Sequence, residues 1–296
     1  MRRFGPGTNS MGRRHRIAAM RLRCRAGLAL LLLLAACSDS RSHALRGQIV
    51  SIDRPRGEVT VRHDAIPGFM SAMTMPFKVR DEKLLNERTA GDLIDATLVV
   101  SKTDSYLSSI TVTGHSPVPE TIPAEQRSGL LKSGSLVADA QFVDQTDAPR
   151  TLRDWAGKTI GLTFIYTRCP LPDFCPRMNR NFGAVQSSLF KDTALREQIR
   201  LISISLDPDF DTPSVLAAHA RRAGADASIW IFLTGARTAI DRFAVQFGVY
   251  VVRDEPTASL THNLRTAVIG PDGRLRKMFD GSDWTPEDLL ASLRQP

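Results

Sequence analysis

Two cysteines, Cys169 and Cys175, have the residue type and the spacing to do chemistry in this 296-residue chain. They follow the apolar run 160–166 (IGLTFIY), which is typical of a buried strand. Apolar residues at helical spacing over 182–189 predict a helix after them, with Pro176 as a good first helical residue. A helix N-terminus favours the thiolate, the form that attacks disulfides or binds soft metals. Because the chain has almost no other cysteine, a reactive or metal-binding pair is favoured over a structural disulfide.

The charge of the chain is concentrated in its first 36 residues. The whole sequence has 39 Lys and Arg against 31 Asp and Glu. Eight arginines and no lysine or acidic residue fall within residues 1–36, and 39 less these eight leaves 31 basic residues, a net charge of zero. The basicity of the full sequence therefore implies no nucleic-acid partner for the rest of the chain.

The same segment has the pattern of an export signal. Its arginines lead into the apolar run 26–34, which is too short for a convincing transmembrane span. The run ends in Leu-Ala-Ala-Cys at Cys37, which resembles the lipobox of bacterial lipoproteins and implies cleavage after residue 36 and a lipid on Cys37. We therefore expect 1–36 to be a lipoprotein signal peptide and the protein to be lipid-anchored on the periplasmic side of a bacterial membrane. A plain secretory peptide is the alternative.

The remaining cysteine count narrows the chemistry. Cys24 lies in the expected signal and Cys37 carries the expected lipid, which leaves Cys169 and Cys175. Outside the cytosol such a pair can form a disulfide, a redox couple or a metal site, and the count alone leaves all three open.

Residues 44–114 predict a small all-β domain. Alternating or strand-like stretches occur at 47–52, 58–63, within 64–79, and at 93–102 and 107–113. Five short strands in about seventy residues favour a small closed barrel of the OB-like kind.

A methionine cluster indicates what this domain binds. Met70, Met73 and Met75 fall within six residues. In a strand, Met73, Met75 and Phe77 share one face, and His63 ends the preceding strand and can lie across from them. Thioethers and an imidazole form a soft ligand set that suits Cu(I). A single methionine is more often a core filler, but the cluster beside a histidine favours a metal site.

The segment HDAIPGFMSAMTMPF, residues 63–77, resembles the CusF-like periplasmic copper-binding domains, and the likeness covers roughly 44–114. The best-known form of that family has a tryptophan between its histidine and its first methionine, which caps the copper, and this chain has none there. Either Phe69 caps the metal instead or Met70 is a further ligand. The resemblance implies three Cu(I) ligands: His63, Met73 and Met75.

The second half of the chain predicts an α/β domain. Residues 115–128 carry three prolines and no apolar period, as expected of a semi-rigid linker. Over 129–296, strands alternate with helices and end in an antiparallel hairpin and a last helix, which predicts a central sheet. A thiol pair between the first central strand and its helix is the arrangement of a thioredoxin-like fold.

This half resembles the Sco/SenC family over roughly 131–293. The residues that carry the likeness are TFIYTRCP (163–170), Cys175-Pro176, LDPDFDTP (206–213), and His262 before the Gly-Pro-Asp-Gly turn. The resemblance implies that Cys169, Cys175 and His262 bind one copper ion. The commoner family loop has three residues between its cysteines and this one has five, so a more open loop is expected.

The chemistry of these donors agrees with copper. Two thiolates and one imidazole can hold Cu(I), or Cu(II) with an added ligand. Binding needs reduced, deprotonated thiols, so copper loading depends on redox state and pH. Asp207 and Asp211 are expected mainly to form a turn and cap the next helix, with a place close to the copper as the alternative. His219 is expected to be structural.

Together these features predict a periplasmic copper protein that takes Cu(I) from a donor on a Met/His site and passes it to, or uses it at, a Cys/Cys/His site. Family resemblance implies the CuA centre of a cytochrome c oxidase, or another cuproenzyme, as the recipient. The main alternative is a thiol-disulfide oxidoreductase in which Cys169 attacks and Cys175 resolves. A thiol peroxidase and a copper buffer for metal resistance are further alternatives.

Overall fold

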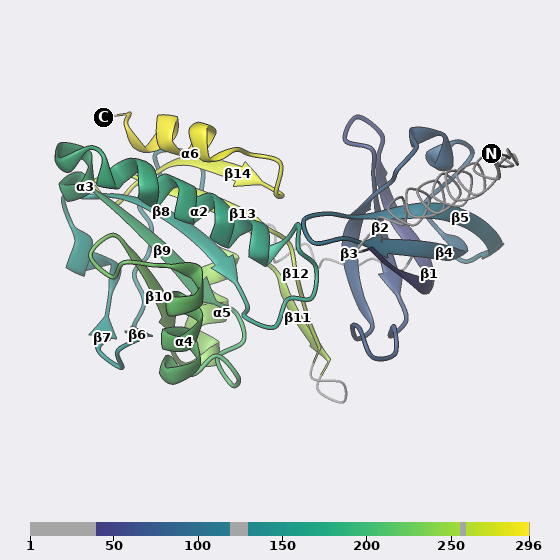
Figure 1. Ribbon diagram of the computed structural model, residues 1–296, viewed down its shortest axis with the longest axis horizontal. Coiled ribbons are helices and arrows are strands. Elements are labelled where there is room, and N and C mark those ends of the chain that lie inside the picture. The colour runs from purple at the N-terminus through teal and green to yellow at the C-terminus, as the bar shows by residue number, and fades with distance from the viewer. Residues whose placement is uncertain (1–39, 119–129, 255–258, 296) are drawn as a thin grey trace, which may run out of the picture. The chain divides into compact units, whose positions relative to one another are not determined.

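The computed structural model describes residues 40–118, 130–254 and 259–295 (Figure 1). The expected signal peptide, Cys37 and most of the expected linker lie outside the described residues. The described residues belong to one compact unit that begins at Ser40. In this part of the chain no helix combines the length and the hydropathy that a membrane span needs.

Residues 40–118 form an antiparallel five-stranded sheet, here called the N-terminal sheet, with the strand order β3-β2-β1-β4-β5. Its strands are β1 (Arg41–Asp53), β2 (Glu58–His63), β3 (Met73–Lys78), β4 (Asp92–Val100) and β5 (Ser105–His115). Buried residues alternate with more exposed ones along β2, where Val59, Val61 and His63 are buried. This alternation is what a sheet with one covered face requires.

The N-terminal sheet is open rather than closed. Its edge strands β3 and β5 are not paired in the sheet order, and they are joined only by an isolated bridge between Val79, the residue after β3, and Leu107 of β5. Pairing stops there because a 3-10 helix, η2 (Glu82–Leu85), follows β3 almost at once. The all-β character expected for this region is confirmed, but the expectation of a closed barrel is wrong.

Residues 130–295 form a seven-stranded sheet with the order β14-β13-β8-β9-β10-β6-β7. Its strands are β6 (Phe142–Asp144), β7 (Pro149–Arg150), β8 (Thr159–Ile165), β9 (Ile199–Ser205), β10 (Trp230–Thr234), β13 (Arg265–Ile269) and β14 (Leu275–Asp280). The central strands β8, β9 and β10 are parallel, and β13 joins β8 antiparallel. A separate hairpin consists of β11 (Val251–Asp254) and β12 (Ser259–His262).

Helices cover both faces of this sheet (Figure 1). They are α2 (Cys175–Phe190), α3 (Thr193–Gln198), α4 (Pro213–Ala223), α5 (Arg237–Val245) and α6 (Pro286–Leu293), with a 3-10 helix η4 (Leu152–Trp155). One core contains residues of α2, α4 and α6, and another contains residues of α5. All of β8 is buried, as expected for a strand between two covered faces. The predicted thioredoxin-like α/β architecture is confirmed.

Helix starts follow the expected capping chemistry. Thr212 caps α4, accepting a hydrogen bond from the backbone N–H of Val215, and Pro213 is the first helical residue. Thr285 and Asp288 form a capping box at α6. These caps fix where each helix begins, and therefore where the loops beside the thiols end.

Candidate metal centres

Cys169 and Cys175 lie where the sequence placed them, in the loop between β8 and α2. Cys175 is the first residue of α2, with Phe174 as the N-cap and Pro176 next. Cys175 is buried and Cys169 is partly buried, and both are free thiols. Cys175 therefore lies at the N-terminus of a helix, whereas Cys169 lies earlier in the loop and is more accessible to solvent.

His262 is the side chain that the fold brings to this pair. It ends β12, and its Nε2 lies 3.8 Å from the Sγ of Cys175. Its Nδ1 lies 3.0 Å from the carbonyl oxygen of Asn263, a contact that keeps the proton on Nδ1 and the lone pair on Nε2. With bonds of about 2.3 Å to sulfur and 2.0 Å to nitrogen, two ligands of a three-coordinate metal lie about 3.7 Å apart. The spacing of Cys175 and His262 therefore suits a shared metal.

The two thiols differ in acidity. A hydrogen bond from the Cys175 thiol, with further support from the Tyr166 hydroxyl, holds the pKa of Cys169 below its ordinary value. Burial raises the pKa of Cys175 well above its ordinary value. The expected thiolate stabilisation of Cys175 by the helix N-terminus is therefore overridden by desolvation. Cys169 is the thiol that ionises first.

The three donors are neighbours without forming a finished site. Cys175 is next to both Cys169 and His262. Yet among the described residues no three His, Cys, Asp or Glu side chains are already grouped as a metal site. Of the two thiols, Cys169 is the more exposed and therefore the less constrained by packing.

Two aspartates fix the start of the cysteine loop. The fully buried carboxylate of Asp211 accepts hydrogen bonds from the backbone N–H and the hydroxyl of Thr167 and from the hydroxyl of Ser205. Asp207 accepts two from Arg168, at 3.0 and 2.6 Å. The sequence favoured turn formation for these aspartates and gave a place close to the copper as the alternative, but it did not predict their hydrogen bonds to Thr167 and Arg168. The available signal was the Thr-Arg pair directly before Cys169.

Arg168 also bears on the peroxidase alternative. Its guanidinium pairs with Asp207 and lies over the ring of Phe210, 4.1 Å from the ring centre. The contacts that the structure describes for this guanidinium are thus with Asp207 and Phe210, and neither of them supports the peroxidase alternative.

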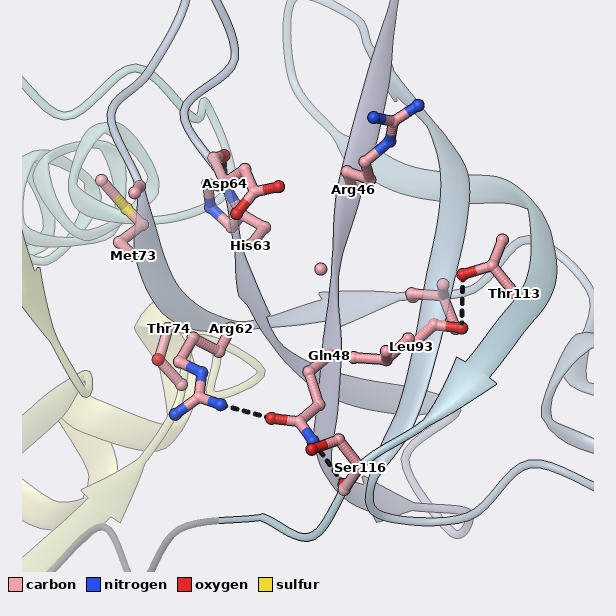
Figure 2. Close-up of a pocket in the computed structure, with 13 residues that line it drawn as sticks. Arg46, Gln48, Arg62, His63, Asp64, Met73, Thr74, Leu93, Thr113 and Ser116 are labelled. Carbon is pink, nitrogen blue, oxygen red and sulfur yellow. Dashed lines mark hydrogen bonds between the residues drawn. The ribbon is translucent and has the colours of Figure 1, made fainter.

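The methionine cluster lies on the N-terminal sheet. His63 pairs directly with Met73 across β2 and β3, and Val61 pairs with Met75. Side chains of His63 and Met75 are buried, and Met73 is half-buried on the same face. A pocket of about 710 Å³ opens beside the pair, and Figure 2 shows His63, Asp64 and Met73 together at one side of it. The cluster is thus within reach of solvent.

His63 has an imidazole nitrogen that lacks a partner. Its Nδ1 lies 2.6 Å from the backbone oxygen of Asp64, while its Nε2 is buried and makes no hydrogen bond. Burial lowers the pKa of His63, so the ring is neutral at pH 7. A buried, unsatisfied nitrogen costs about 1–3 kcal/mol. A soft metal bound at Nε2 would satisfy it, and the donor set therefore fits Cu(I).

Met70 and Phe69 differ in their surroundings. Met70 is buried in the same hydrophobic cluster as Met75, and its backbone is bridged to Ile66. Phe69 stacks on His43, with ring centres 4.0 Å apart and planes 14° apart. One face of the Phe69 ring is therefore taken by an imidazole, and Met70 is left as the better candidate for an additional donor.

Sequence reasoning missed His43. Its Nε2 is also buried without a partner, and its ring covers the loop that leads to the methionines. His43 lies on β1, twenty residues before His63. Nothing in the local sequence ties the two together, because the stacking partner comes from the β2–β3 connection.

Known proteins resemble both halves of the chain. Residues 131–295 match the family model SCO1/SenC, and residues 42–112 match that of the copper binding periplasmic protein CusF. The chain is 30% identical over 156 residues to the SCO1 protein homolog of Bacillus subtilis, a match covering 49% of this chain and 78% of that protein. It is 33% identical over 156 residues to a putative copper-binding protein of Stutzerimonas stutzeri, covering 50% and 70%.

Solved structures with similar folds include a SCO1/SenC family lipoprotein from Bacillus anthracis, with a TM-score of 0.49, 27% identity, and coverage of 56% of this chain and 97% of that one. Another is BsSco, described as a member of the Sco family of cytochrome c oxidase assembly proteins, with a TM-score of 0.47, 26% identity, and coverage of 56% and 95%.

The comparisons confirm both resemblances seen in the sequence. Copper is the metal that the matched families and relatives indicate, as the sequence predicted. The CusF model also agrees with the predicted periplasmic location. The lipid on Cys37, the individual ligands and the recipient enzyme stay predictions.

Proposed function

Because the chain belongs to the SCO1/SenC family, we propose that it is a lipid-anchored periplasmic copper-transfer protein with two Cu(I) sites. The observation that carries the proposal is the presence of two soft-donor clusters in one chain, a thioether and imidazole cluster and a thiol and imidazole cluster. The CuA centre of a cytochrome c oxidase is the preferred recipient, as the resemblance to the Sco/SenC family implies.

At the first site, His63, Met73 and Met75 hold incoming Cu(I), with Met70 as a further donor. Thioethers need no deprotonation, and an oxidising compartment cannot convert them to a disulfide. This site therefore accepts copper whatever the redox state of the cysteines. The pocket beside His63 and Met73 is the entry for the donor that supplies the metal.

At the second site, Cys169, Cys175 and His262 hold copper as cargo. Burial lowers the pKa of His262 to about 4, so Nε2 is free to bind metal at neutral pH. Cys169 supplies the first thiolate, and Cys175 gives up its proton only when the metal replaces it, because the buried thiol ionises poorly alone. Loading this site therefore releases protons, and its affinity rises with pH.

Copper stoichiometry tests the proposal. Reduced protein should bind about two Cu(I), and either Cys169→Ser/Cys175→Ser or Met73→Leu/Met75→Leu should lower this to about one. Met278→Leu, a partly buried methionine away from both clusters, is the matched control. X-ray absorption should find sulfur and nitrogen neighbours at each remaining copper. Equal copper in both double variants and the parent protein would contradict the proposal.

A thiol-disulfide oxidoreductase is the second candidate, and the unequal thiol acidities favour it. The Cys169 thiolate would attack a partner disulfide and form a mixed disulfide, releasing one partner thiol. Cys175 would then attack Cys169, forming the intramolecular disulfide and releasing the second partner thiol. His262→Ala separates the candidates, since it removes a copper donor and leaves both exchanging sulfurs in place. Unchanged copper binding together with retained exchange would favour the reductase.

A further inference from the structure

The tip of the cysteine loop is buried outside its own domain. Leu171 is fully buried, although it lies in a connection between a strand and a helix. The hydrophobic cluster that contains it is that of the N-terminal sheet, which also includes Met70, Met75 and Phe77. Phe174 packs against this cluster and against the core beneath α2. The loop between the two thiols is therefore bound to the part of the chain that carries the methionines.

Polar groups fix the same contact. Ser105 donates its hydroxyl hydrogen to the carboxylate of Asp173 at 2.6 Å, and both side chains are buried. Lys78 pairs with Asp283 at 2.7 Å, at the rim of the contact. Buried polar partners give a contact specific geometry, whereas an exposed ion pair contributes little energy. The hydrogen bond between Ser105 and Asp173 therefore fixes the position of the cysteine loop on the N-terminal sheet.

The contact falls at the opening of the N-terminal sheet. Lys78 ends β3 and Ser105 begins β5, and these are the edge strands that are joined only by the isolated bridge between Val79 and Leu107. Uncovered sheet edges and apolar interiors are liabilities that proteins cover with a loop or a helix. Here the cysteine loop covers the gap between β3 and β5. Leu171 packs into the apolar interior of the N-terminal sheet, which strand pairing would cover if the sheet were a closed barrel.

The two candidate copper sites flank this contact. β3, which carries Met73 and Met75, neighbours β12, which carries His262. A cavity of about 270 Å³ lies between them and is lined by Pro76, Phe174 and His262, among others. Docking thus places the imidazole of the thiol site beside the strand that holds the thioethers.

We propose that the cysteine loop is a latch: Leu171 and Asp173 dock on the N-terminal sheet, which shields the thiols from outside proteins while copper passes between the two sites of one chain. Undocking then exposes Cys169 and Cys175 to the recipient. The role in copper passage rests on the proposed function, whereas the docking and the shielding do not.

The test changes the sheet side of the contact, so that the cysteine loop keeps its own sequence. Ser105→Asp sets a second carboxylate against Asp173. Ser109→Asp is the matched control, because Ser109 lies exposed on the same strand. In the double variant Ser105→Asp/Asp173→Asn, the carboxylate at position 105 can accept a hydrogen bond from the amide at position 173. The contact then has one donor and one acceptor again, with the two roles exchanged. Each variant is made in the full-length protein, reduced and metal-free, and its two thiols are alkylated with iodoacetamide.

We expect Ser105→Asp to raise the alkylation rate about tenfold, which corresponds to about 1.4 kcal/mol of lost docking. Ser109→Asp should match the parent protein, and the double variant should return to the parent rate. An unchanged rate in Ser105→Asp, an equal rise in Ser109→Asp, or no recovery in the double variant overturns the latch. Circular dichroism of each variant checks that the sheet is still folded.

Copper passage is measured separately. One equivalent of Cu(I) is added to reduced protein, and the ultraviolet absorption of the copper–thiolate bond is followed in time. Ser105→Asp should slow its growth while both sites still bind copper at equilibrium. Equal rates in Ser105→Asp and the parent protein overturn the role in passage. A parent protein that binds no Cu(I) contradicts the proposed function instead, and the alkylation result still decides the docking.

Discussion

Gly47 lies directly opposite His63 where β1 pairs with β2, and a Cβ on residue 47 would fall 2.8 Å from the Cα of His63. The same Cβ would lie 2.5 Å from the backbone oxygen of Arg62. Those atoms are backbone and cannot rotate away, so the close strand approach at the methionine site depends on glycine. The position of the His63 imidazole therefore depends on a residue that has no side chain.

Gly47→Ala should push β2 away from β1 and weaken Cu(I) binding at the methionine site without removing a ligand. An overpacked contact of this kind costs about 1–3 kcal/mol. The measurement is Cu(I) affinity by competition with a chelator, in the Cys169→Ser/Cys175→Ser background. Gly114→Ala is the control, because its Cβ would meet only the Leu93 side chain, at an ordinary 3.5 Å. Equal affinity in the two glycine variants would argue against this dependence.

The thiols should titrate in a fixed order. Because the pKa of Cys169 is lowered and that of Cys175 is raised, alkylation of metal-free protein should modify Cys169 first. The rate at Cys169 should rise with a midpoint below pH 9, and Cys175 should stay unmodified until higher pH. Mass spectrometry of the digested protein identifies the labelled residue. Labelling of Cys175 before Cys169 would show that the helix N-terminus prevails over burial after all.

Asp211 should matter for the loop more than its place in a turn suggests. Asp211→Ala leaves the Thr167 backbone N–H, the partly buried Thr167 hydroxyl and the buried Ser205 hydroxyl without their acceptor, which should lower the free energy of unfolding by about 2–4 kcal/mol. Urea denaturation measures this loss. Asp209→Ala in the same turn is the control, because Asp209 is exposed and pairs only with Arg237 in the contacts described. If both variants lost a similar free energy of unfolding, the loss would come from disturbing the turn and not from the hydrogen bonds of Asp211.

The sequence predicted what local patterns determine. The apolar run of β8, the caps at Thr212 and Thr285, and the His63–Met73 pairing all follow from periodicity or from residue type at an element end. The strand-to-helix position of Cys169 and Cys175 follows from the same signals.

What the sequence could not predict depends on burial and on contacts between distant segments. The helix end at Cys175 is worth about 0.3–1 kcal/mol to a thiolate, and desolvation of a buried group outweighs that amount. The bond between Ser105 and Asp173 joins residues 68 positions apart, and no local pattern marks it. The same is true of the stacking of His43 on Phe69.

His262 should make the stability of the metal-free protein sensitive to mild acid. The pKa of His262 falls to about 4 in the folded protein through burial, whereas an unfolded histidine takes up its proton near pH 6.5. Below pH 6.5 the unfolded chain therefore binds a proton that the folded chain refuses, and stability contributed by this residue is lost as the pH falls from about 6.5 to about 4. Urea midpoints at pH 7 and pH 5 measure the loss. His262→Gln should reduce the difference between the two midpoints. An unchanged difference in His262→Gln would mean that the imidazole can be protonated within the fold, and then His262 could not remain a free nitrogen donor in mildly acidic surroundings.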